Sequence, residues 1–138
     1  MNFVFIADFY ADEILGGGEI NNEVLIDTLR NRGHKVVKVK SSDVTESFIQ
    51  ENIESFFVLA NFVQLDSSII EKLQQLNYVI YEHDHKYLRN RDPAMFADYK
   101  APQNEIVNKK LYSNAIAVLC QSKFHCDILR KNINIDNV

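Results

Sequence analysis

The chain has 138 residues, of which 46% are hydrophobic and 25% are charged, and its formal net charge is −4. This composition is typical of a single globular domain and excludes disordered, collagen-like and linker-rich chains. The negative charge argues against a general affinity for nucleic acid. No apolar run approaches the roughly 18 residues that a transmembrane helix needs.

The N-terminal residues 2–7 are mostly apolar and rich in residues that favour β-structure. No basic region precedes them and no small-residue cleavage site follows them, so they indicate a buried first strand rather than a signal peptide. The two cysteines, Cys120 and Cys126, suit a cytoplasmic protein with unpaired thiols.

The first helix is expected over residues 19–32, where apolar side chains recur at steps of four. Gly33 follows this stretch and is typical of a helix C-cap. The apolar residues that carry this pattern are Ile20, Val24, Leu25 and Leu29.

The alternation of strand and helix continues to the end of the chain. Further strands are expected over 34–40, 56–60, 78–81 and 115–120, and further helices over 43–53, 66–76, 103–112 and 122–131. Asp43, with Glu46 as its capping-box partner, and Asp66 are the N-cap candidates of two of these helices. The pattern predicts a three-layer, Rossmann-like α/β fold, in which a parallel five-stranded sheet has helices on both faces.

Two long loops, 8–18 and 82–102, leave the carboxyl ends of expected strands, where parallel sheets bind their ligands. The first loop ends in three consecutive glycines, Gly16, Gly17 and Gly18. Glycine permits close approach of a ligand to the backbone, and the free N–H groups at a helix start attract anions. We therefore predict a phosphate site there. A flexible turn before a helix start that Glu19 stabilises is the alternative.

Two common nucleotide motifs are missing from the glycine segment. The spacing does not match G-x-G-x-x-G, and the chain contains no G-x-x-x-x-G-K-[ST] string. Binding of NAD or of a P-loop nucleotide is therefore disfavoured.

The second loop begins with Glu82-His83-Asp84-His85. Histidine can act as an acid, a base, a hydrogen-bond donor or a metal ligand at neutral pH, so His83, Asp84 and His85 are candidate catalytic residues. A closed zinc site needs four ligands, and no second pair at suitable spacing is present, so we expect no metal. The alternative is a polar loop whose histidines cap the strand end.

Further candidates lie near these residues in the sequence. Arg89 and Arg91 could contact an anionic or acceptor ligand or could be solvated charges. Ser122 could contact a ligand or simply begin the last helix. His125 and Cys126 are adjacent and should point to different parts of that helix, which disfavours a Cys–His nucleophile pair.

The order of these features resembles the N-terminal domain of a GT-B glycosyltransferase, particularly the retaining enzymes of family four. The resemblance covers essentially the whole chain and rests on residues 16–19, 78–85 and 115–122. It implies that Gly16, Gly17, Gly18 and Glu19 lie at the diphosphate of a nucleotide-sugar donor. It implies that a histidine, His83 or else His85, lies near the transferred sugar. The donor is a substrate, and no further cofactor is implied.

Members of this family have a second Rossmann-like domain with most of the donor contacts, whereas this chain ends soon after its last expected helix. We therefore expect residues 1–138 to be one acceptor-side domain that needs a C-terminal domain or a partner chain for turnover. The acceptor would be a glycan or a lipid-linked molecule. Peripheral membrane association stays open, although no basic amphipathic helix argues for it.

A non-catalytic flavodoxin-like or receiver-like domain, with a binding or regulatory role, is the alternative from another class. Asp8 and Lys123 are placed as a receiver would require. The third expected strand, however, ends in Ala60-Asn61, where a receiver has its aspartate phosphoacceptor.

Overall fold

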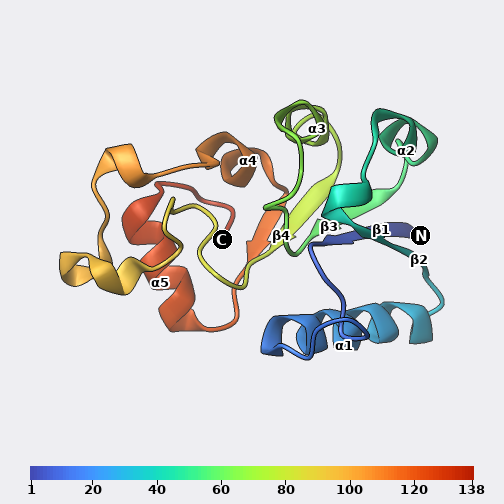
Figure 1. Cartoon of the computed structure of the whole chain (residues 1–138), viewed down its shortest axis with the longest axis horizontal. Helices are drawn as coiled ribbons and strands as arrows, with labels where there is room; N and C mark the ends of the chain where they lie inside the picture. Colours follow the sequence, from blue (N-terminus) through green and yellow to red (C-terminus); the bar gives the residue numbers. More distant parts are fainter. The chain divides into compact units, whose positions relative to one another are not determined.

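The computed structural model describes residues 1–138 and contains a five-stranded parallel sheet with strand order β2-β1-β3-β4-β5 (Figure 1). The strands are β1 Asn2–Ala7, β2 Lys35–Lys40, β3 Phe56–Leu59, β4 Tyr78–Tyr81 and β5 Ala117–Leu119. The helices are α1 Gly17–Asn31, α2 Glu46–Glu51, α3 Ser67–Leu73, α4 Lys109–Asn114 and α5 Lys123–Asn132. The predicted three-layer, Rossmann-like α/β fold is confirmed. None of the helices has the length and apolarity that crossing a membrane requires.

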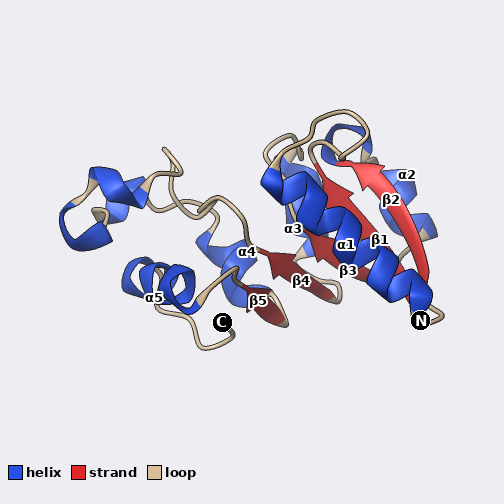
Figure 2. Ribbon diagram, turned by 90° about the horizontal axis from the view of Figure 1, so that it is seen from below, coloured by secondary structure: helices blue, strands red, loops and turns tan.

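The chain divides into two compact units, Met1–Tyr78 and Val79–Val138. In the first unit, β1 pairs in parallel with β2 on one side and with β3 on the other. Helix α1 covers one face of these strands, and α2 and α3 cover the other (Figures 1 and 2). Strand β1 is buried on both faces, and the side chains of Val4, Phe5 and Ile6 are fully inaccessible. Burial of each such side chain stabilises the fold by about 1.5–3 kcal/mol.

Helix α1 begins two residues earlier than expected, with Gly16 as its N-cap. Its C-cap is Arg32, and Gly33 follows in a left-handed conformation with a φ of +87°, which is typical of a helix end. Two of the apolar residues that indicated this helix lie on its outer side, since Ile20 and Val24 are 47% and 61% exposed. Asn22 and Ile26 face the sheet instead. Ile20 and Val24 are four residues apart, and so are Asn22 and Ile26. The helical spacing alone therefore does not show which of the two pairs is buried.

Helix α2 is shorter than expected because its N-cap is Thr45 and not Asp43. The Thr45 side chain accepts a hydrogen bond from the backbone N–H of Phe48 at 3.1 Å, and Ser41–Asp43 forms a separate 3-10 turn. The expected capping box of Asp43 and Glu46 is therefore wrong. Asp66 does precede α3, but its side chain makes no capping hydrogen bond.

In the second unit, the helix expected over residues 103–112 is wrong in its first half. Residues 105–107 run beside residues 87–89: the N–H of Val107 donates to the carbonyl of Tyr87, and that of Arg89 donates to the carbonyl of Glu105, both at 2.9 Å. Asn108 then takes a left-handed conformation at φ 58°, and α4 follows it. These hydrogen bonds use backbone N–H and carbonyl groups that a helix over residues 103–112 would need, so the helix does not form in that half.

Asn132, in the last turn of α5, fastens the long loop of the second unit. Its Oδ1 accepts from the N–H of Ala101 at 2.8 Å, and its Nδ2 donates to the carbonyls of Tyr99 at 2.8 Å and of Ile128 at 2.9 Å. One buried side chain thereby anchors a segment that has no regular secondary structure of its own beyond short 3-10 turns.

Candidate functional site

The glycine segment of the first unit lies at the start of α1, where Gly17 and Gly18 belong to the first helical turn. A Cβ atom on Gly16 would collide with Oε2 of Glu19, so the Glu19 carboxylate folds back over this glycine. A carboxylate at a helix N-terminus is stabilised by the helix dipole. Glu19 therefore lies in the first turn of α1, at the position where a phosphate was predicted.

Asp8 connects the loops that follow the strands of the first unit. The side chain is 9% exposed, and its carboxylate accepts a hydrogen bond from the hydroxyl of Ser41 and a long one, 3.4 Å, from the N–H of Gln64. Tyr10 is buried nearby, and its hydroxyl oxygen lies within hydrogen-bond distance of the carbonyl oxygens of Phe5 and Val39, at 2.7 and 2.8 Å, so its single proton is shared between these two acceptors. These contacts stiffen the carboxyl-end loops of β1 and β2.

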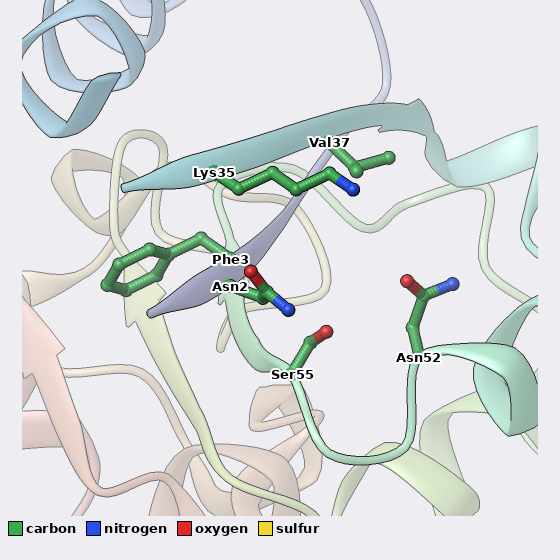
Figure 3. Close-up of a pocket in the computed structure, with 6 residues that line it drawn as sticks. All are labelled: Asn2, Phe3, Lys35, Val37, Asn52 and Ser55. Atoms are coloured by element: carbon green, nitrogen blue, oxygen red, sulfur yellow. The ribbon is translucent and has the colours of Figure 1, made fainter. Parts of the chain in front are cut away.

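A pocket lies at the opposite end of the same strands, where β1 and β2 begin (Figure 3). It is lined by Asn2, Phe3, Lys35, Val37, Asn52 and Ser55. Its volume is about 50 Å³, whereas sites for small organic ligands usually measure about 300–1,000 Å³. A nucleotide sugar does not fit into it.

The second unit is organised around Glu82, whose side chain is 1% exposed. Oε2 accepts a hydrogen bond from the Tyr112 hydroxyl, and Oε1 accepts one from the backbone N–H of His85 at 2.6 Å. The Glu82 backbone is bound as well, since its N–H donates to the carbonyl of Leu119 at 2.8 Å and its carbonyl accepts from Nε2 of Gln121 at 3.0 Å. The carboxylate therefore fixes the loop that follows β4.

His125 approaches this carboxylate from the first turn of α5. Its Nε2 lies 3.7 Å from Oε1 of Glu82, and its ring stacks on that of His85 with centroids 4.1 Å apart and planes 21° apart. Stacked rings do not direct their nitrogens to a common point. No group of three or more His, Cys, Asp or Glu side chains is arranged to hold a metal ion.

The protonation of these groups follows from their surroundings. Burial alone would raise the pKa of Glu82, but His125 and Tyr112 beside the carboxylate and the charge of Lys86 outweigh it and lower the pKa. Burial, followed by the neighbouring His125, lowers the pKa of His85 to about 4. At neutral pH the cluster thus combines a buried carboxylate with an uncharged imidazole.

His83 contacts residues at the ends of two strands. Its ring packs edge-on against Tyr81 with centroids 4.6 Å apart, and its Nδ1 lies 3.2 Å from Nε2 of Gln121. Because this amide nitrogen also donates to the carbonyl of Glu82, Gln121 links His83 to the backbone of the buried glutamate.

The basic residues of the long loop contact carboxylates of the same unit. Asp84 accepts from Nζ of Lys86, which is 3% exposed, and from NH1 of Arg91 at 3.3 Å. Arg89 lies 3.9 Å from the Glu105 carboxylate on the surface. An anionic ligand at either arginine would therefore compete with an ion pair that is already present.

The start of α5 shows the structural role of Ser122, whose hydroxyl caps the helix by accepting from the N–H of His125 at 3.1 Å. Burial, aided by the adjacent Cys126 thiol, raises the pKa of Cys120. A protonated thiol is a poor nucleophile, so Cys120 is not a candidate nucleophile.

The sequence analysis did not include Tyr87 and Tyr112 in this cluster, and it considered His125 only as a partner of Cys126. Both tyrosines are fully buried, and their hydroxyls contact His85 and Glu82. For His125 a signal was present. Ser122 is a typical N-cap, and the third helical residue after such a cap lies in the first turn, close to the strand ends.

Comparison with known proteins adds no family to these observations. The chain matches no protein-family model, and no curated protein or solved structure shows significant similarity to it.

Proposed function

We propose that this chain is the acceptor-side, N-terminal domain of a GT-B-type glycosyltransferase, which moves a sugar from a nucleotide-sugar donor to a glycan or lipid-linked acceptor. The observation that carries the proposal is the buried Glu82 carboxylate, which binds the His85 backbone and lies beside His125. Burying a carboxylate beside imidazoles costs stability unless all are paired, and such arrangements concentrate at functional sites. The cluster follows the carboxyl end of β4, where ligands bind in parallel sheets.

The transfer breaks the bond between the anomeric carbon and a diphosphate oxygen and forms a bond to an acceptor oxygen. Negative charge develops on the leaving diphosphate, which backbone N–H groups of Gly16–Gly18 would stabilise once the Glu19 carboxylate moves aside. Positive charge develops on the sugar ring. The imidazole of His85, which is uncharged at neutral pH, can bind a sugar hydroxyl there without electrostatic repulsion, and His83 of the same loop is the other candidate for this contact.

Nuclear magnetic resonance of the ¹⁵N-labelled chain tests this proposal. UDP-glucose, GDP-mannose and the corresponding nucleoside diphosphates are titrated separately, with free glucose as the comparison. We expect the amides of Gly16–Gly18 to shift with the diphosphates and not with glucose. The variant Gly17→Ala should lose this response, whereas Glu71→Gln, on the exposed side of α3, should keep it. Unchanged spectra with all four diphosphate compounds contradict the donor-binding role.

The coding sequence downstream of Val138 provides a second test. A following or neighbouring reading frame for another α/β domain is expected if this domain works as half of a glycosyltransferase. A stop codon without such a neighbour would contradict a catalytic role.

A further inference from the structure

The two ring nitrogens of His85 have different surroundings. Nδ1 lies 2.6 Å from the hydroxyl oxygen of Tyr87, which is a hydrogen-bond distance. Nε2 has no hydrogen-bond partner on the protein and is not among the buried polar atoms that lack one, so it reaches solvent. A ligand can approach only this nitrogen.

The environment of the Tyr87 hydroxyl determines which group donates in the hydrogen bond between Tyr87 and His85. The Tyr87 side chain is fully buried, and burial, followed by the charge of Glu82, raises the pKa of its hydroxyl, which therefore keeps its proton. His85 is the only hydrogen-bond partner of this hydroxyl. A buried O–H without an acceptor costs about 1–3 kcal/mol. Tyr87 therefore donates, and Nδ1 of His85 accepts.

Further contacts fix the position of the imidazole. His85 has a left-handed backbone at φ 54°, and its N–H is bound by the Glu82 carboxylate. One ring face is covered by His125. The charged or titratable groups that act on the ring are Glu82, Asp92 and His125, together with the Tyr87 hydroxyl.

We propose that Tyr87 is a positioning residue that holds His85 as the tautomer with its proton on Nε2, so that the site presents a fixed, uncharged N–H donor to a ligand oxygen. In this state Nε2 cannot act as a general base, because it already carries a proton. The inference rests on the proposed function only for the identity of the ligand. If that function is right, the ligand oxygen that accepts from Nε2 belongs to the sugar or to its diphosphate.

Long-range ¹H–¹⁵N correlation spectra of the histidine rings test the tautomer without any ligand. The His85 signals are assigned by their loss in His85→Asn. We expect a protonated Nε2 and an unprotonated Nδ1 at pH 7, unchanged down to pH values near 5. A wild-type His85 with its proton on Nδ1, or with both tautomers mixed, overturns the proposal.

The variant Tyr87→Phe keeps the buried ring and removes the hydroxyl. We expect its two His85 nitrogen shifts to move toward each other as the tautomers mix. The control is Tyr99→Phe in the same unit, whose hydroxyl makes no hydrogen bond to the protein. This variant should leave the two nitrogen shifts unchanged. If Tyr87→Phe folds and keeps the wild-type pattern, Tyr87 does not set the tautomer.

A titration with UDP-glucose then separates the two proposals. We expect the His85 Nε2–H signal to shift in the wild-type chain. A correct tautomer without any ligand response contradicts the glycosyltransferase function alone, and a ligand response from the wrong tautomer contradicts the positioning role alone.

Discussion

The imidazole of His85 stacks on that of His125, and the Glu82 carboxylate binds the backbone N–H of the first and lies 3.7 Å from Nε2 of the second. Protonating His85 in this position would place a positive charge in a buried setting against another imidazole. Its pKa is accordingly lowered from 6.5 to about 4, by burial first and by His125 second.

Stability should therefore depend on pH. Between about pH 6.5 and 4 the unfolded chain binds a proton at residue 85 that the folded chain does not, so the free energy of unfolding should fall as the pH is lowered through this window. Urea unfolding at half-unit pH steps measures the slope. His85→Asn, which tolerates the left-handed backbone, should have a shallower slope, and an equal slope in both proteins would contradict the assignment.

Replacing Glu82 by glutamine should destabilise the fold by about 2–4 kcal/mol, because the amide cannot accept both hydrogen bonds that the carboxylate accepts. Chemical denaturation measures the loss. Glu71→Gln makes the same chemical change at an exposed position and should stay within about 0.5 kcal/mol of the wild type. Similar values for the two variants would show that the Glu82 network is not structural.

Two glycine substitutions should change the free energy of unfolding in opposite directions. Gly33 has a φ of +87°, so Gly33→Ala should lower the free energy of unfolding by about 1–2 kcal/mol. A Cβ on Gly17 would meet no atom within 4 Å in a helical turn, so Gly17→Ala should raise it by up to about 1 kcal/mol. Thermal unfolding compares the two. A Gly17→Ala protein that is more stable and yet loses nucleotide-sugar binding would separate the role of this glycine in binding from any role in folding.

Asn132→Ala should release the loop that this side chain anchors. Three hydrogen bonds are lost, two of them to residues 99–101, and the expected destabilisation is about 2–3 kcal/mol. Limited trypsin digestion should show faster cleavage after Lys100. The control Asp98→Asn breaks the exposed ion pair with Lys131 and should be cleaved at the wild-type rate.

The sequence predicted the strands well, because short apolar runs between helices leave few alternatives to a parallel sheet. The predictions from sequence were wrong or incomplete where contacts between residues far apart in the chain determine the local structure. The pairing of residues 105–107 with 87–89 overrides the helical pattern there, and the exposed side of α1 carries apolar residues at helical spacing. The candidate site was found only in part. The Glu82–His85 run is visible as a motif, but the approach of His125 depends on how two distant segments of the second unit pack.

The Glu82 carboxylate orders the start of the long loop during folding, before any ligand arrives. Conformational entropy that many loops lose on association is here already lost in the free protein. Ligand binding at this loop should therefore show a small change in heat capacity, set by the apolar area of the ligand rather than by coupled folding of the chain. Calorimetry over a range of temperatures would reveal this preorganisation as a nearly constant binding enthalpy.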